Sequence, residues 1–319
     1  MRRVAAPLAA VVFALALGAC GDDGAEPGAS REATVVLDFQ PNAVHAGLYA
    51  ALERGYFDDE GVSLEIREPS ASTDAPKLLA AGRTEFAILD IHDLGLARER
   101  GLDLVGVAAI VQRPLAAVIA RDRDAVQEPG DLEGARVGVT GLPSDDAVLD
   151  SVLEAGGADP AQVERVTIGF ESVAALSAGR IDAATAFWNA EGVILRRLGV
   201  ATREFRVDAY GAPRYPELVL ATSAETFSSD ADLVEGVVAA LADGQRDVVE
   251  QPEAALDDLV SSVDGLDERE QRAQLEALLD ADAISPDAGF DRSVLERWAR
   301  WDVRHGILAQ PPGIPEVFP

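Results

Sequence analysis

The residues best suited to bind a small molecule stand where apolar runs end and helical patterns begin. Carboxylates and amides can accept or donate hydrogen bonds, and aromatic rings can cover the face of a flat ligand. In open α/β sheets, ligands bind beyond the carboxyl ends of the strands, where the next helices begin. We therefore select these residues as candidate ligand contacts: Asp38, Phe39, Asn42, His45, Asp90, Gln112, Ser144, Asp145, Trp188, Asn189, Glu191 and Tyr215.

Catalytic chemistry finds little support in the same sequence. No Ser/His/Asp order, metal-ligand cluster or glycine-rich phosphate loop stands out, so we predict no catalytic residue, metal or cofactor. Cys20 is the single cysteine in 319 residues, which excludes an intramolecular disulfide and a cysteine-based zinc site. His92 and Asp93 are adjacent, so their side chains diverge on a helix.

The N-terminus has the pattern of an export signal. Arg2 and Arg3 precede an apolar stretch over residues 4–19, which ends in Leu-Gly-Ala before Cys20. The run is shorter than the roughly 20 residues of a membrane-spanning helix. We predict a lipoprotein signal peptide over 1–20, acylation of Cys20, and attachment to the outer face of the cell membrane. The alternative is an ordinary signal peptide with a chance cysteine. The Gly/Asp/Glu/Pro-rich residues 21–32 predict a flexible tether.

Charge limits the possible partners. The formal net charge is −29, from 56 acidic and 27 basic residues, and Lys77 is the single lysine. Such a chain does not bind a nucleic-acid backbone by bulk electrostatics. We interpret the excess of acidic residues as a feature that keeps the surface soluble or as an adaptation to habitat, and not as a means of binding a specific partner.

Apolar runs alternate with helical patterns along the chain, which predicts α/β architecture. Strands are expected at 34–37, 64–66, 86–89, 103–109, 115–120, 137–139, 164–168, 181–186, 203–207 and 218–222. Helices are expected at 43–54, 74–81, 91–100, 145–155, 172–178, 190–198, 231–249, 252–262, 267–280 and 291–305, with Ser144 as the cap of the fourth. Trp298 and Trp301 are interpreted as packing residues of the last helix.

Two α/β lobes could follow one another or be interleaved. The strands 115–120 and 218–222 flank the second set of elements and could form two crossings, a hinge suited to closure around a ligand. We predict lobe 1 from residues 33–118 plus 219–319, and lobe 2 from residues 119–218.

Several motifs resemble a known family. They are Leu37-Asp38-Phe39-Gln40-Pro41-Asn42-Ala43-Val44-His45-Ala46-Gly47-Leu48-Tyr49, Leu79-Ala80-Ala81-Gly82-Arg83, Gly179-Arg180-Ile181-Asp182-Ala183 and Trp188-Asn189-Ala190-Glu191-Gly192. Together they resemble the thiamine-pyrimidine family over residues 34–319. This family contains ABC-transporter binding proteins for thiamine-precursor pyrimidines, relatives that bind riboflavin, and fungal pyrimidine-precursor synthases. The resemblance implies the type II periplasmic-binding fold, with a permease and an ATPase as partners.

The resemblance also implies roles within the site. Trp188, Asn189 and Glu191 would supply a stacking face, an amide and a carboxylate for an aminopyrimidine; alternatively, Glu191 is a solvated residue favoured by the helix dipole. Phe39 stands where many relatives have tryptophan. His45 either bonds to the ligand or closes the cleft. Arg113 is the nearby cation that could favour an anion instead.

An enzymatic role is disfavoured by the same resemblance. The synthase branch has a pyridoxal-phosphate lysine in the segment matching 87–93 and a cysteine-rich run matching 217–221, and this chain has neither. We therefore predict the solute-binding component of an ABC importer, capturing a hydroxymethyl- or formylaminomethyl-pyrimidine. Riboflavin or another heteroaromatic or sulfonate-like ligand is the alternative, and a synthase-like enzyme or a sensory domain is less favoured.

Overall fold

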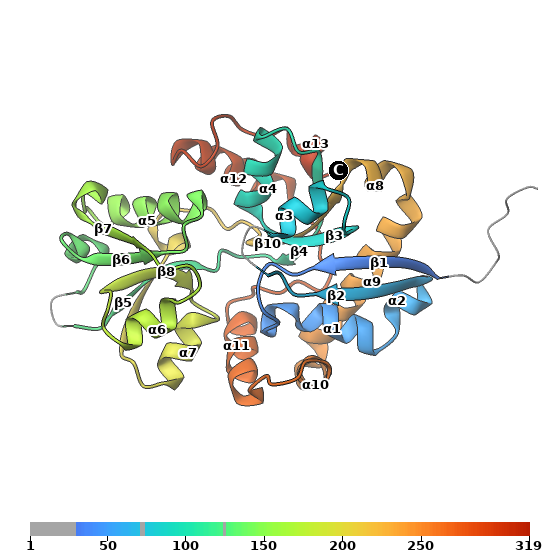
Figure 1. Cartoon of the computed structure of the whole chain (residues 1–319), viewed down its shortest axis with the longest axis horizontal. Helices are drawn as coiled ribbons and strands as arrows, with labels where there is room; N and C mark the ends of the chain where they lie inside the picture. Colours follow the sequence, from blue (N-terminus) through green and yellow to red (C-terminus); the bar gives the residue numbers. More distant parts are fainter. Residues whose placement is uncertain (1–29, 71–73, 124–125) are drawn as a thin grey trace, which may run out of the picture.

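Two five-stranded sheets organise the chain in the computed structural model, which describes residues 30–70, 74–123 and 126–319 (Figure 1). The first sheet, sheet A, has the strand order β2-β1-β3-β10-β4. Its strands are β1 (Arg31–Val36), β2 (Val62–Arg67), β3 (Phe86–Asp90), β4 (Leu104–Val111) and β10 (Leu218–Ser223).

Sheet B has the order β7-β6-β8-β5-β9. Its strands are β5 (Ala116–Arg121), β6 (Arg136–Val139), β7 (Glu164–Thr167), β8 (Ala183–Phe187) and β9 (Thr202–Arg206). Both sheets are mixed: β1 and β6 pair in parallel with their neighbours, whereas β10 and β5 are antiparallel to both of theirs. The predicted α/β class is confirmed.

Helices cover the faces of both sheets (Figure 1). The α-helices are α1 (Ala46–Glu53), α2 (Tyr56–Asp59), α3 (Asp74–Ala80), α4 (Ile91–Glu99), α5 (Pro143–Ala155), α6 (Ser172–Ser177), α7 (Glu191–Arg197), α8 (Ala224–Ser229), α9 (Ala231–Glu250), α10 (Pro252–Ser262), α11 (Glu268–Asp280), α12 (Arg292–Arg304) and α13 (Ile314–Val317). Short 3-10 turns are η1 (Ala43–His45), η2 (Pro129–Leu132), η3 (Pro160–Gln162) and η4 (Val207–Tyr210). Within the described residues, no helix is long and apolar enough to cross a membrane.

The C-terminal helices return to the elements around sheet A. Helices α9 and α10 pack on α1, and α13 packs on β4. The α1–α9 contact requires small residues, because a Cβ atom added to Gly244 would overlap the carbonyl oxygen of Gly47. Trp298 and Trp301 of α12 are both buried.

Three local starts differ from the sequence-based expectations. Strand β1 begins at Arg31, inside the predicted tether. Parallel pairing with β2 gives its backbone N–H and C=O groups hydrogen-bond partners, and this does not depend on the side chains. The predicted helix 43–54 opens with η1. Helix α5 begins at Pro143, and its N-cap is Leu142. The predicted cap, Ser144, therefore lies within the first turn of the helix. The predicted signal peptide, Cys20 and most of the tether lie outside the described residues.

Two segments cross between the sheets. Residues 112–115 join β4 to β5, and residues 211–217 join η4 to β10. Strand β5 lies entirely in sheet B, so the first crossing comes a few residues before the predicted lobe boundary at 118/119.

Candidate functional site

A cavity of about 130 Å³ lies between the two sheets, where a single water would need only about 10–15 Å³. From the side of sheet A it is lined by Asp38, Phe39, Asn42, Val44, Ala75, Pro76, Ile88, Leu89, Asp90, Asp93 and Leu218. From the side of sheet B it is lined by Ala116, Thr140, Leu142, Ser144, Asp145, Gly169, Phe170, Ser172, Thr185, Ala186, Phe187, Asn189, Ala190 and Glu191. Eight of the twelve candidates are in this lining.

The charge of the cavity has one sign. Its lining contains five carboxylates, from Asp38, Asp90, Asp93, Asp145 and Glu191, and neither lysine nor arginine among the described residues. Carboxylates accept hydrogen bonds and attract cations. The cavity therefore suits a ligand that presents hydrogen-bond donors or a positive charge.

Asp38 is fixed by a short hydrogen-bonded chain. The backbone N–H of Asn42 donates to Nδ1 of His45 at 3.1 Å, which leaves the ring proton on Nε2. Nε2 therefore donates to Oδ1 of Asp38 at 2.9 Å. His45 is buried and does not line the cavity, so its observed contact orients Asp38.

Asn189 and Glu191 occupy the turn between β8 and α7. The side chain of Asn189 is fully buried, and neither its amide nitrogen nor its amide oxygen has a hydrogen-bond partner within the described part of the chain. Glu191 is partly exposed towards the cavity, and its Oε2 accepts from the N–H of Phe187 at 3.0 Å. Burial raises the pKa of Glu191 above its ordinary value. An unpaired buried amide is costly unless a ligand satisfies it.

Carboxylates face each other across the cavity. Burial, reinforced by the carboxylate of Asp145, raises the pKa of Asp93 to about 6, although His92 acts in the opposite direction. Burial also raises the pKa of Asp145, even though Thr140 donates to it from its N–H at 2.8 Å and from its hydroxyl. Burial raises the pKa of Asp90 well above its ordinary value, and Asp90 also accepts from the N–H of His92 as the cap of α4.

The sequence analysis missed two aromatic residues of the lining. Phe170 follows β7, and Phe187 ends β8; the ring of Phe170 meets that of Phe39 edge to face, with centroids 4.6 Å apart. Phe187 ends an apolar strand directly before Trp188, and this position is the signal that could have identified it.

Trp188, Gln112 and Tyr215 lie outside the cavity lining. The indole N–H of Trp188 donates to the carbonyl oxygen of Pro114 at 3.0 Å, and the Arg206 guanidinium lies 4.0 Å from the ring centroid. Gln112 donates to the carbonyl of Gly289 at 2.7 Å. Tyr215 is fully buried against His92 and Trp301. These contacts engage the three side chains outside the cavity lining.

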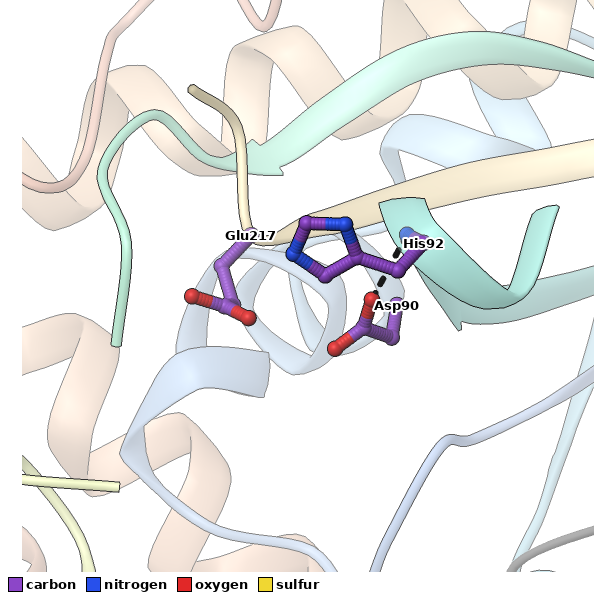
Figure 2. A group of neighbouring side chains, drawn as sticks. All are labelled: Asp90, His92 and Glu217. Carbon is purple, nitrogen blue, oxygen red and sulfur yellow. Dashed lines mark hydrogen bonds between the residues drawn. The ribbon is translucent and has the colours of Figure 1, made fainter. Parts of the chain in front are cut away.

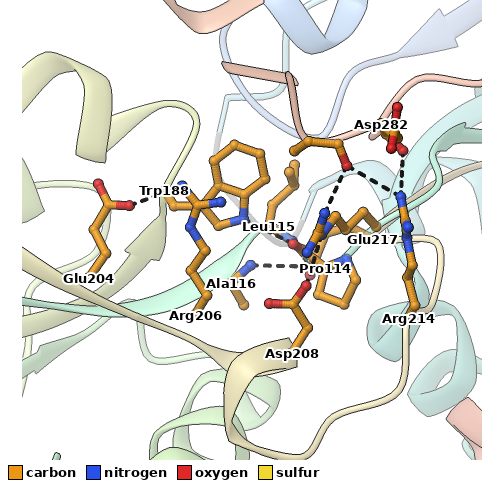
Figure 3. A network of polar contacts seen from close by, with 12 residues as sticks. Pro114, Leu115, Ala116, Trp188, Glu204, Arg206, Asp208, Arg214, Glu217 and Asp282 are labelled. Carbon is orange, nitrogen blue, oxygen red and sulfur yellow. Dashed lines mark hydrogen bonds and ion pairs between the residues drawn. The ribbon is translucent and has the colours of Figure 1, made fainter. Parts of the chain in front are cut away.

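The two crossing segments are tied together (Figure 3). The Glu217 carboxylate accepts from the backbone N–H groups of Leu115 and Ala116. Arg113 pairs with Asp208 at 2.8 Å and donates to the Ala281 carbonyl at 2.8 Å. Arg113 is therefore engaged at the crossing and absent from the cavity lining.

One cluster in the described chain could offer ligand atoms to a cation (Figure 2). Asp90, His92 and Glu217 each place such an atom within 4.8 Å of the others. Each also has a structural contact: Asp90 caps α4, Glu217 binds the first crossing, and Nδ1 of His92 lies 2.9 Å from Asp302. Burial lowers the pKa of His92, but Asp302 and Asp90 outweigh it and raise the pKa to about 9. These contacts account for the cluster without a metal ion.

The sequence of this chain is similar to those of a binding protein and a synthase. The family described as NMT1/THI5 like matches residues 42–255. The chain belongs to the NMT1/THI5-like family. The formylaminopyrimidine-binding protein of Halalkalibacterium halodurans is 32% identical, over 98% of this chain and 96% of that protein. A 4-amino-5-hydroxymethyl-2-methylpyrimidine phosphate synthase of Legionella pneumophila is 25% identical over 55% of each chain.

Solved structures agree on the fold of this family member. The periplasmic aliphatic sulphonate binding protein SsuA of Escherichia coli matches with a TM-score of 0.72 at 13% identity, over 90% of this chain and 92% of that chain. The fold is therefore that of the type II periplasmic solute-binding proteins, as predicted.

Proposed function

We propose that this chain is the solute-binding component of an ABC importer and that it captures a thiamine-precursor pyrimidine of the formylaminopyrimidine type. The observation that carries the proposal is the cavity lining, which among the described residues has five carboxylates and neither lysine nor arginine. The near-full-length similarity to a formylaminopyrimidine-binding protein supports the same ligand class.

The chemistry of an aminopyrimidine fits this lining. Its exocyclic amine and protonated ring nitrogen are neighbouring donors, and one carboxylate can accept from both. Glu191 would take this role, with Asn189 supplying both a donor and an acceptor to the remaining edge. Phe39 would cover a face of the ring.

Anionic ligands are disfavoured by the same lining. A sulfonate carries a full negative charge and needs arginine, lysine or clustered N–H donors. Similarity to a sulphonate-binding structure at 13% identity concerns the fold alone. The part of the lining that the structure describes also has no lysine for a Schiff base, so we propose ligand capture and not turnover.

Export and attachment belong to the same proposal. Acylation of Cys20 would hold the protein on the outer face of the membrane, near a permease and its ATPase. The elements around sheet A and those around sheet B would form the two lobes that close on the ligand, divided at the crossings 112–115 and 211–217 and not at residues 118/119.

Calorimetry on the purified protein with a formylaminopyrimidine, riboflavin and taurine tests this function. We expect binding of the pyrimidine and no measurable heat with taurine. Mass spectrometry of small molecules that co-purify with the protein gives an independent answer. Binding of taurine alone would refute the proposal.

A further inference from the structure

Phe170 is an exposed aromatic residue beside the cavity. Three large hydrophobic side chains of the described chain are exposed, namely Phe170 at 44%, Leu198 at 61% and Val249 at 41%. Of these, Phe170 alone lines the cavity. A single exposed apolar side chain is common on protein surfaces. What distinguishes Phe170 is that it lines the cavity and contacts a ring that follows a strand of the other sheet.

The backbone presents this ring to the opposite lobe. Phe170 stands in the loop between β7 and α6, directly after Gly169, whose φ of 55° lies in the left-handed region that favours glycine. The ring packs edge to face on Phe39, which follows β1 of sheet A, at 4.6 Å and 73°. The pair therefore joins loops that belong to different sheets, on either side of the cavity.

We propose that Phe39 and Phe170 form an aromatic gate, in which Phe170 closes over the planar ligand and sets how long it stays bound. The inference rests on the proposed function for its ligand. Cleft opening must separate the two rings, because they are attached to different lobes. Closure brings Phe170 back against Phe39 and the ligand, and thereby excludes water from the carboxylates beneath. Phe170 is thus a residue that selects flat aromatic ligands.

The gate predicts an effect on dissociation. Aromatic contacts formed after closure stabilise the bound state and not the encounter, so their loss acts mainly on the dissociation rate. Phe170→Ala should raise the dissociation rate of a formylaminopyrimidine about tenfold and change the association rate little. Phe170→Tyr keeps the ring and should behave like the wild type, whereas Phe170→Leu should resemble Phe170→Ala.

Stopped-flow fluorescence on the full chain measures both rates. Leu198→Ala is the matched control, since Leu198 is exposed on α7–β9 of the same half and absent from the cavity lining. Thermal melting checks that each variant is folded. A dissociation rate of Phe170→Ala within twofold of the wild type, or an equal rise in Leu198→Ala, overturns the gate.

Small-angle X-ray scattering separates the gate from the ligand assignment. Without ligand, Phe170→Ala should have a larger radius of gyration than the wild type and Leu198→Ala, because the aromatic contact at the cavity is lost and the contacts of α7 with α11 remain. If the wild type binds no pyrimidine but this expansion is seen, the proposed function fails and the gate stands. An unchanged radius of gyration counts against the gate.

Discussion

Replacement of Glu191 by glutamine separates the role of its charge from that of its shape. Oε2 of Glu191 accepts from the Phe187 N–H, and the glutamine carbonyl oxygen can keep this bond. The other carboxylate oxygen becomes an NH2 group, which donates and therefore opposes the donors of an aminopyrimidine. The variant should keep the turn between β8 and α7 while losing one charge-assisted hydrogen bond to the ligand.

The size of the effect follows from that bond. Hydrogen bonds to charged groups contribute about 1.5–3 kcal/mol. Since about 1.4 kcal/mol corresponds to a tenfold change in affinity, the Kd should rise about tenfold to hundredfold. Stability should move the other way, because burial raises the pKa of Glu191 and thus disfavours its charged form in the fold. The Tm of the ligand-free variant at neutral pH should be equal to or above that of the wild type.

Calorimetry and thermal melting together make the assay decisive. Glu171→Gln is the matched control, because Glu171 is exposed beside α6 and absent from the cavity lining. Unchanged pyrimidine affinity in Glu191→Gln would refute this account of the site. Weaker binding accompanied by a clearly lower Tm would show that Glu191 supports the fold and not the ligand.

Three further expectations concern other parts of the molecule. Asn189→Ala should weaken pyrimidine binding about tenfold in calorimetry without lowering the Tm, because its amide has no partner in the described chain; a large loss of Tm would contradict this. Burial raises the folded-state pKa of Glu217 to about 7 from 4.5, so the stability linked to its proton is present below pH 4.5 and lost as pH rises to 7, on the order of 3 kcal/mol. Urea unfolding of Glu217→Gln should therefore have a flatter pH dependence than the wild type over this range, and an equal slope would argue against the assignment. Cys20→Ser should release the protein from the membrane fraction in detergent-free fractionation, and full retention would refute the lipid anchor.

Local patterns in the sequence predicted most elements because apolar runs and helix periods are local signals. Strand β3 and helices α9 and α10 begin and end within a residue or two of their expected positions. The antiparallel direction of β5 and β10 was not predictable in this way, since an apolar run reads the same in either direction. It depends on which segments cross between the sheets.

The candidate site residues also differ in whether local sequence or tertiary contacts determine their position. Asp38, Asn189 and Glu191 could be placed near the cavity from the sequence because each follows the end of a strand. Trp188 stands in the same turn, but its indole N–H is satisfied by Pro114, 74 residues away, and only the tertiary structure shows this. Phe170 was missed because a single aromatic residue in a loop carries no periodic signal.

The place of β10 in sheet A has a consequence for synthesis of the chain. β10 lies between β3 and β4, so β4 has no partner strand in sheet A, and β3 has β1 alone, until residues 218–223 are available. All five strands of sheet B lie between Ala116 and Arg206, so that sheet can form while the C-terminus is still absent. Contacts that span long stretches of chain form slowly, because loop closure must precede them. Sheet A should thus be the last part to become protease-resistant, and a chain still emerging from a ribosome stays partly unfolded until β10 has been delivered.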